Sequence, residues 1–289
     1  MIDAPKLSII IPVYNEQDAI FDLLNNLAPV AEECEAEVIV IDDGSTDASA
    51  QILSQFEKQN KIKLIKHPQN LGYGKAIKTG LNNAKAELVL IIDGDGSYPL
   101  NEIPTLAEKA SDKKMIVGAR KAGIKAEPLV RRIFKWLVIR LLRYLAGYEI
   151  KDLNSGMRIF PRSLCQKYIS LLPDGFSFTS TLTLIFLSEG WQIEYVEIPY
   201  QPRKGRSKFR LREIFPLSLL LLRTIMYFNP LKFFLPLSFA LVLIGLFVAF
   251  FSIFVLGKFM DVTTAVILIG AVQVFVLGLL ADLILRLKK

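Results

Sequence analysis

The sequence predicts an α/β domain built on a parallel sheet, followed by a hairpin of two transmembrane helices. Between residue 7 and about residue 119, short apolar runs alternate with polar segments of helical length, which is the pattern of βαβ units. Two long apolar stretches without charges lie near the carboxyl end. The composition supports this division, because 52% hydrophobic residues are too many for an ordinary soluble protein and 22% charged residues are too many for a fully embedded one.

Five apolar runs are the expected strands of the sheet. They cover residues 7–11, 37–41, 62–65, 88–92 and 115–117, and a helix is expected over residues 75–84. Ligands of such sheets bind beyond the carboxyl ends of the strands. Polar clusters follow three of these ends, namely P-V-Y-N-E at residues 12–16, D-D-G-S-T-D at 42–47 and D-G-D-G-S-Y-P at 93–99. The sequence therefore predicts a ligand site at this edge.

The D-G-D triplet of the third cluster has the spacing of a metal site. Residues i and i+2 of an extended chain point to the same side, so Asp93 and Asp95 can present both carboxylates to one point. Mg²⁺ prefers one or two carboxylates and takes its other oxygens from water and phosphate. A D-x-D triplet also occurs about once by chance in a chain of this length, so the two neighbouring clusters decide the interpretation.

Both apolar stretches are long enough to cross a membrane as helices. Residues 233–256 would extend about 36 Å and residues 262–281 about 30 Å, and we place the spans at about 233–256 and 262–284. Cations gather before the first span and after the second, and only Lys258 lies between them. By the positive-inside rule, the amino-terminal region and both termini are expected in the cytoplasm. The chain starts directly with a strand, so no signal peptide is expected.

Charge and short motifs limit the class of partner. The net charge of +7 suits nucleic acid, but the anionic cytoplasmic face of a membrane attracts the same cations, and we expect no nucleic-acid partner. No complete dinucleotide-binding loop and no P-loop motif occurs in the sequence. Cys34 and Cys165 lack metal-ligand spacing and fit a reducing compartment. His67 precedes a proline and is interpreted as an ordinary loop residue.

A segment that is both basic and apolar predicts a helix at the membrane surface. Over residues 127–147, apolar residues occupy one half of the helical wheel and the other half holds the cations Arg131, Arg132, Lys135, Arg140 and Arg143. This pattern is typical of an interfacial helix, and a helix packed on the domain core is the alternative. Residues 211–228 share the character and are expected to form a juxtamembrane amphipathic helix.

Five motifs occur in a fixed order along the chain. They are P-V-Y-N-E, D-D-G-S-T-D, D-G-D, V-G-A-R (117–120) with D-L-N-S-G-M-R (152–158), and P-R-K-G-R-S-K (202–208). Over residues 7 to about 212, the sequence resembles the inverting GT-A glycosyltransferases that act on polyprenyl phosphates, of the dolichol-phosphate mannose synthase and bactoprenol glucosyltransferase type. The resemblance implies a GT-A domain at residues 1–210, the helix at 211–228 and a membrane hairpin at 229–289.

The resemblance also implies substrates and residue roles. The donor would be a UDP- or GDP-hexose, and the acceptor would be undecaprenyl or dolichyl phosphate at the cytoplasmic membrane face. Pro12, Tyr14 and Glu16 would line the nucleoside pocket, and Asp43 would read the base. Asp93 and Asp95 would bind the donor diphosphate through Mg²⁺ or Mn²⁺. Members often have D-A-D-L-Q, and here Ser97 replaces the glutamine, which leaves the third metal ligand open. The cations expected to meet the phosphates are Arg120, Arg131, Arg132, Arg203 and Lys208.

The acceptor chemistry needs no strong general base. A phosphomonoester carries about −1.5 to −2 charges at pH 7, so a lipid phosphate is already an ionised nucleophile. The site must instead stabilise the charge that develops on the leaving diphosphate. Asp152 is the remaining carboxylate that can orient the acceptor, which makes it a candidate catalytic residue beside Asp93 and Asp95. Its alternative role is a loop cap for Asn154 and Ser155.

Two other functions are kept as alternatives. A processive membrane polysaccharide synthase shares the catalytic fold, but such enzymes carry a Q-x-x-R-W-type motif and several more spans, which this sequence lacks. A non-catalytic lipid-binding scaffold is the second, and the intact Asp93 and Asp95 argue against it. Metal-dependent protection of the chain by nucleoside diphosphates would distinguish an enzyme from a scaffold. A homo-oligomer is left open.

Overall fold

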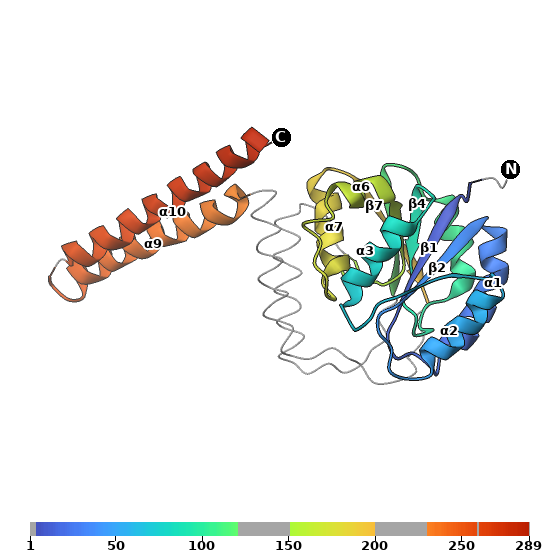
Figure 1. Cartoon of the computed structure of the whole chain (residues 1–289). Coiled ribbons are helices and arrows are strands. Elements are labelled where there is room, and N and C mark those ends of the chain that lie inside the picture. The colour runs from blue at the N-terminus through green and yellow to red at the C-terminus, as the bar shows by residue number, and fades with distance from the viewer. Residues whose placement is uncertain (1–3, 121–150, 200–229, 259, 289) are drawn as a thin grey trace. The chain divides into compact units, whose positions relative to one another are not determined.

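The computed structural model describes residues 4–120, 151–199, 230–258 and 260–288 (Figure 1). The chain divides into two compact units, which are considered separately. The first unit contains the described residues up to 199, and the second contains those from 230 onward. The predicted helices at 127–147 and 211–228 lie outside the described residues, as do Arg131, Arg132, Arg203 and Lys208.

A seven-stranded sheet forms the centre of the first unit, in the order β3-β2-β1-β4-β6-β5-β7. The strands are β1 (Leu7–Val13), β2 (Ala36–Asp42), β3 (Lys63–Lys66), β4 (Leu88–Ile91), β5 (Lys114–Arg120), β6 (Arg158–Pro161) and β7 (Gln192–Ile198). All five predicted strands are present, with their ends shifted by up to three residues. The sheet is not wholly parallel, because β6 runs antiparallel to both β4 and β5.

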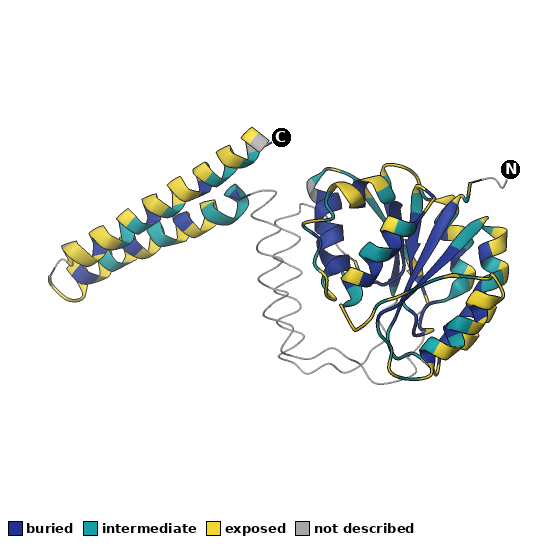
Figure 2. Cartoon of the chain, viewed as in Figure 1, coloured by how far each residue is buried: buried dark blue, intermediate teal, exposed yellow. Residues whose placement is uncertain are grey.

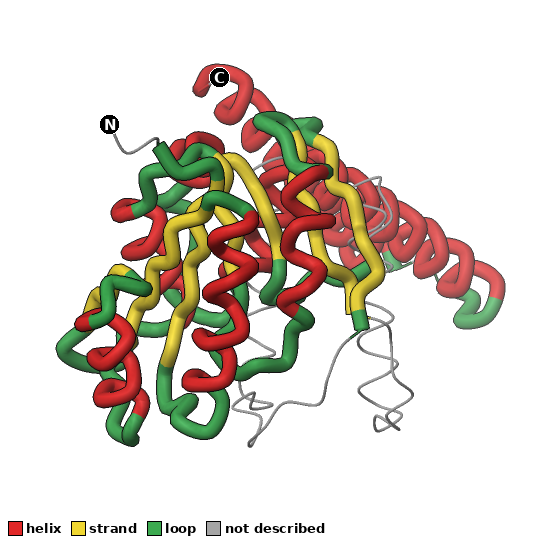
Figure 3. The backbone as a smooth tube through the Cα atoms, turned by 90° about the vertical axis from the view of Figure 1, so that its right-hand side faces the viewer, coloured by secondary structure: helices red, strands yellow, loops and turns green. Residues whose placement is uncertain are grey.

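Helices cover both faces of the sheet (Figure 3). The helices α1 (Ile20–Glu33), α2 (Ser49–Lys58) and α4 (Ile103–Glu108) pack on the face that contains Ile9 and Ile11. On the opposite face, Gly80 of α3 (Tyr73–Asn83) lies against Ile10 and Ile41, and α7 (Phe178–Ser188) packs beside α3. The shorter helices are η1 (Leu100–Glu102) and α6 (Arg162–Lys167). Because both faces are covered, every residue of β1 is buried (Figure 2), which explains why all of them except Ser8 are apolar.

Strand direction gathers the polar clusters at one edge. β1, β2 and β4 pair in parallel, and the antiparallel β6 between β4 and β5 leaves β5 parallel to them. The carboxyl ends of these four strands therefore share one edge, and β6 begins at that same edge. The segment 152–157, which leads into β6, consequently lies at the same edge as the three clusters that follow β1, β2 and β4, and its Gly156 lies against Asp93 of the third cluster. The edge site that the sequence predicts is thus assembled from five strand ends.

The second unit consists of α9 (Leu231–Phe254) and α10 (Asp261–Lys288), packed along each other. Small residues permit the close contact: a side chain at Gly278 would meet Phe234, and a side chain at Gly245 would meet Leu268. Ser238 Oγ also donates a hydrogen bond to the carbonyl of Ala271 at 2.9 Å. Both helices are long and apolar enough to cross a membrane, and only 17% of each span is buried within the structure. The two helices begin within two residues of the predicted spans.

Candidate active site

The loops after β1 and β2 are joined into one structure. Asn15 lies in the left-handed region (φ 52°), which lets its side chain reach the second loop. The Thr46 amide donates to Asn15 Oδ1 at 2.8 Å, and the Asn15 amide donates to Ser45 Oγ at 3.1 Å. The Glu16 amide donates to Ser49 Oγ at 2.9 Å. Of the three expected nucleoside contacts, Pro12 is buried near the end of β1, and Tyr14 and Glu16 follow half-buried on the braced loop.

Asp43 is buried and holds the neighbouring loop in place. Its carboxylate accepts hydrogen bonds from the amides of Leu71 and Gly72, both at 2.9 Å, and contacts His67 Nδ1 at 2.7 Å. Because a carboxylate only accepts, Nδ1 carries the proton of this bond. His67 Nε2 lies 3.0 Å from Thr79 Oγ1. His67 lies in the loop after β3, as expected, but its side chain is only 8% exposed and contacts the aspartate expected to read the base.

A glycine makes this arrangement possible. Gly44 has φ 71°, and a Cβ atom there would lie 2.4 Å from the backbone carbon of Gln69. The D-D-G turn can therefore press directly against the loop that carries His67. The consequence is a compact corner around Asp43, built from residues far apart in sequence.

The two aspartates of D-G-D follow β4, each with a bracing partner. Asp95 is 7% exposed and accepts hydrogen bonds from the Ser97 hydroxyl at 2.6 Å and from the Ser97 amide at 3.1 Å. Asp93 accepts a hydrogen bond from the Tyr73 hydroxyl at 2.8 Å. Ser97, which replaces the glutamine of the D-A-D-L-Q pattern, thus orients Asp95 through two hydrogen bonds.

The donor set at this strand end fits a hard divalent cation. In the described parts of the chain, no group of three His, Cys, Asp or Glu side chains is placed to hold a metal. A pair of carboxylates is nevertheless what Mg²⁺ or Mn²⁺ requires when substrate phosphates and water complete the coordination. The acids present are therefore compatible with a metal held jointly by the protein and a diphosphate.

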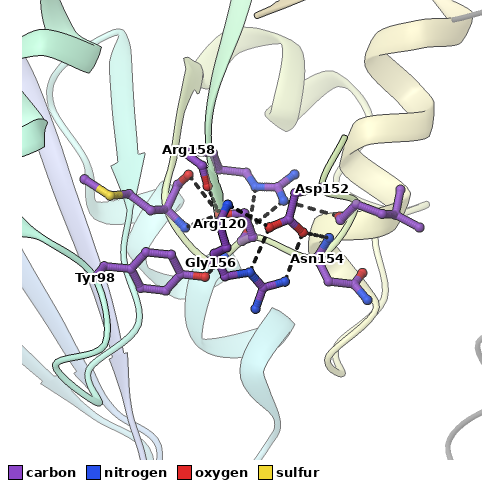
Figure 4. Close-up of polar contacts among 10 residues, drawn as sticks. Tyr98, Arg120, Asp152, Asn154, Gly156 and Arg158 are labelled. Atoms are coloured by element: carbon purple, nitrogen blue, oxygen red, sulfur yellow. Dashed lines mark hydrogen bonds and ion pairs between the residues drawn. The ribbon is translucent and has the colours of Figure 1, made fainter. Parts of the chain in front are cut away.

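Arg120 and Asp152 form a two-point ion pair at the same edge (Figure 4). Arg120 Nε and Nη2 donate to the two carboxylate oxygens at 2.8 and 2.9 Å. Burial alone would raise the pKa of Asp152, but hydrogen bonds and charge from Arg120 outweigh it, and the net pKa is lowered. Asp152 also accepts from the Asn154 amide at 3.1 Å. The loop-cap role is therefore present, together with a direct contact to an expected phosphate-binding arginine.

Comparison with known proteins assigns the family. The profile described as "Glycosyl transferase family 2" matches residues 8–169. The chain belongs to this family. A second profile, described as "GtrB C-terminal hairpin", matches residues 229–287, which include both helices of the second unit. This family 2 glycosyltransferase therefore joins a catalytic domain of GT-A fold to a hairpin known from related proteins.

Curated relatives of this glycosyltransferase act on lipid phosphates, according to their names. A dolichyl-phosphate beta-glucosyltransferase of Trichomonas vaginalis is 27% identical over 241 residues, covering 76% of this chain and 71% of that protein. An undecaprenyl-phosphate 4-deoxy-4-formamido-L-arabinose transferase of Photorhabdus laumondii is 31% identical over 165 residues, covering 56% of this chain and 50% of that protein. The chain thus spans between half and about seven-tenths of the length of these relatives.

Solved structures support the fold. Glucosyl-3-phosphoglycerate synthase from Mycobacterium tuberculosis, crystallised with Mn²⁺, UDP and phosphoglyceric acid, superposes with a TM-score of 0.60 at 20% identity, covering 77% of this chain and 79% of that one. A mycobacterial protein gives the same TM-score at 18% identity, covering 77% and 75%. At this identity the likeness concerns the fold alone, which is the GT-A class that the sequence predicts.

A buried cation supports the segment that leads into β6. Arg158 is 0% exposed, and its guanidinium donates to the carbonyls of Leu153, Ser155 and Thr179 and to the Thr183 hydroxyl at 2.6 to 3.4 Å. Burial lowers the pKa of Arg158, and negative charge on Asp152 acts in the opposite direction. Arg158 thereby ties the D-L-N-S-G segment to α7.

Sequence reasoning missed several residues of this site. Tyr73, Tyr98, Gly156 and Arg158 were given no role, although Gly156 and Arg158 belong to the quoted D-L-N-S-G-M-R motif. An arginine at the start of a short apolar run (R-I-F-P) was a readable signal of a buried cation. The contacts of Tyr73 with Asp93 and of His67 with Asp43 had no such signal, because the two residues of each pair lie in different segments of the chain.

Proposed function

We propose that this glycosyltransferase transfers a hexose from a nucleoside diphosphate sugar to a polyprenyl phosphate, with inversion at the anomeric carbon. An oxygen of the lipid phosphate forms the new bond to C1, and the bond from C1 to the donor diphosphate breaks, so that the nucleoside diphosphate leaves with the electron pair. The observation that carries the proposal is the combination of Asp93 and Asp95 at a family 2 strand edge with the two-helix hairpin. The named activities of the relatives support it.

A divalent cation would be held by Asp93 and Asp95 and would stabilise negative charge on the leaving diphosphate. The residues of the chain have separate tasks around it. Ser97 and Tyr73 orient the two carboxylates, and Asp43 with its loop holds the base end. Mn²⁺ is the first metal to test, because the M. tuberculosis synthase of similar fold was crystallised with it. Mg²⁺ has the same ligand preferences.

The acceptor phosphate would meet a cation that is already oriented. Asp152 holds the guanidinium of Arg120 in a fixed plane, and the Arg120 side chain remains 31% exposed. A planar guanidinium with fixed direction recognises phosphate oxygens without removing a proton from them. Asp152 then acts through Arg120 rather than as a base. Arg131, Arg132, Arg203 and Lys208 are proposed as further phosphate contacts on the basis of the sequence alone.

The two-helix hairpin would hold the catalytic domain close to a lipid acceptor. A polyprenyl tail is soluble only in the membrane, so its phosphate remains at the interface. Two apolar helices would keep the catalytic domain at that depth, and the distribution of cations supports a cytoplasmic location for the domain and both termini. A processive synthase and a non-catalytic scaffold are not favoured, since the relatives are named as a dolichyl-phosphate glucosyltransferase and an undecaprenyl-phosphate sugar transferase.

The decisive experiment is an acceptor and donor screen with the full-length protein in neutral detergent. UDP- and GDP-hexoses are offered with undecaprenyl or dolichyl phosphate and Mn²⁺ or Mg²⁺, and formation of the lipid-linked sugar is measured. Wild type should yield a polyprenyl-phosphate hexose with inverted anomeric configuration. Asp95→Asn, which removes one charge and little volume, should reduce transfer on the order of 100-fold or more while the thermal unfolding midpoint stays within a few degrees. Polymer formation, or equal activity of Asp95→Asn, would contradict the proposal.

A further inference from the structure

Tyr73 makes a contact that the reaction chemistry does not require. It is the first residue of α3, and its hydroxyl donates to Asp93 Oδ1 at 2.8 Å. A phenolic hydroxyl carries a proton and a carboxylate accepts one, so Tyr73 is the donor in this contact. The contact orients an acid that the proposed function assigns to the metal.

Gly156 also lies directly against the carboxylate of Asp93. A Cβ atom at position 156 would lie 2.2 Å from Asp93 Oδ2 and 2.4 Å from its Cγ, so only glycine leaves room for the carboxylate. The Gly156 amide is itself held by a hydrogen bond to the Tyr98 hydroxyl at 2.6 Å. Asp93 thus contacts a hydrogen-bond donor and a fixed backbone, which together restrict its side-chain rotation.

The segment that carries Tyr73 is held rigidly. A Cβ atom at Gly74 would lie 2.1 Å from the carbonyl oxygen of Pro173, and the Lys75 amide donates to the Asp174 carbonyl at 3.0 Å. The ring of Tyr73 stacks on Phe176 with centroids 5.7 Å apart and an interplanar angle of 16°. These contacts fix the position of the hydroxyl without using it.

The neighbouring residue Gly72 donates its amide to Asp43 at 2.9 Å. Two consecutive residues therefore contact two acids with different proposed tasks, one at the base and one at the metal. The peptide between them therefore connects the acid expected at the base with the acid expected at the metal.

We infer that Tyr73 is a positioning residue for Asp93: with Gly156, it fixes the carboxylate in the orientation that receives a divalent cation bound to the donor diphosphate. This inference rests on the proposed function, since it assumes that Asp93 and Asp95 hold the metal. Residues that orient metal ligands typically change metal affinity by about 10- to 100-fold when altered. Tyr73 does not touch the reacting atoms, and its effect passes through Asp93.

Mn²⁺ binding tests the inference without relying on turnover. The full-length protein in neutral detergent is titrated with Mn²⁺ in the presence of UDP, or of GDP in a parallel series, and bound Mn²⁺ is followed by electron paramagnetic resonance. Tyr73→Phe keeps the ring and its stacking on Phe176, and should weaken Mn²⁺ binding on the order of 10-fold. Affinity for the nucleotide without metal should be unchanged. Tyr168→Phe, which removes a hydroxyl from a half-buried tyrosine at the end of α6, is the matched control and should leave Mn²⁺ binding unaltered.

A double-mutant cycle separates positioning from general destabilisation. In an Asp93→Asn background, where Asp95 and the nucleotide phosphates remain as ligands, Tyr73→Phe should weaken Mn²⁺ binding by less than about twofold further. Gly156→Ala should reproduce the loss by displacing Asp93. Equal effects of Tyr73→Phe in both backgrounds, or no effect in wild type, would overturn the inference alone. Absence of Mn²⁺ binding by the wild-type protein with either nucleotide would instead contradict the metal site of the proposed function, and the inference with it.

Discussion

Arg120 and Asp152 meet through two parallel hydrogen bonds of 2.8 and 2.9 Å, although 32 positions separate them in the sequence. The pair joins the end of β5 to the segment that enters β6. An arginine held at two points presents its remaining surface in a defined direction, which a lysine cannot do. The V-G-A-R motif and the D-L-N-S-G-M-R motif are therefore in direct contact through this pair.

Arg120→Lys tests this directional role. The substitution keeps the charge but loses the two-point contact, and we expect kcat/KM for the lipid phosphate to fall on the order of 10-fold. Asp152→Asn should give a similar loss, and the double variant should be little worse than either single one, because both disrupt one unit. Lys6→Met, which breaks an exposed ion pair with Glu35, is the control and should be neutral. Additive losses in the double variant would contradict a shared function.

The pH dependence of stability follows from the same pair. The pKa of Asp152 is lowered below its ordinary value of 3.8, so the ion pair contributes its full stability above about pH 3.8. That contribution is lost as the pH falls below this value, because the folded protein must then take up a proton against the arginine. The unfolding temperatures of wild type and Asp152→Asn should therefore converge as the pH is lowered from 6 towards 3. A constant difference between the two unfolding temperatures over this pH range would show that the ion pair makes no pH-dependent contribution to stability.

Arg158→Met should destabilise the catalytic domain. The variant keeps an apolar side chain of comparable length but leaves the carbonyls of Leu153, Ser155 and Thr179 without their donor, at a cost of about 3 kcal/mol or more. Chemical denaturation of the full chain in detergent measures the loss. Arg162→Met is the comparison, because Arg162 begins α6 at the other end of β6 and donates to one carbonyl, that of Ala84. A larger effect at Arg162 would contradict this account of the buried cation.

His67→Phe tests the support of Asp43. Loss of the Nδ1 donor should loosen the carboxylate and weaken binding of the nucleoside diphosphate by about 10-fold, since a hydrogen bond to a charged group contributes about 1.5 to 3 kcal/mol. Binding of inorganic pyrophosphate, which has no base, should be unchanged. His67→Asn places an amide donor near the Nδ1 position and should restore part of the affinity. Equal weakening for pyrophosphate would indicate a general loss of structure instead.

Local patterns in the sequence determined the architecture. Apolar runs bounded by polar clusters identified β1 to β5, and uncharged stretches of membrane length identified α9 and α10. The positions of Asp43, Asp93 and Asp95 at strand ends followed from the same runs, because parallel strands must expose their carboxyl ends at one edge. These features depend on residues that are close in sequence, which is why periodicity and composition reveal them.

Only the tertiary structure decided which groups surround those acids. The antiparallel strand β6 was not predicted from the sequence, yet it places Arg158, and Gly156 just before it, at the site. The hydrogen bonds of Tyr73 to Asp93 and of His67 to Asp43 span 20 and 24 positions and join separate loops. Such contacts depend on how the strands are ordered and how closely their loops pack. The sequence therefore specified the acids and the membrane helices, and the packing of distant loops specified the residues that hold the acids in place.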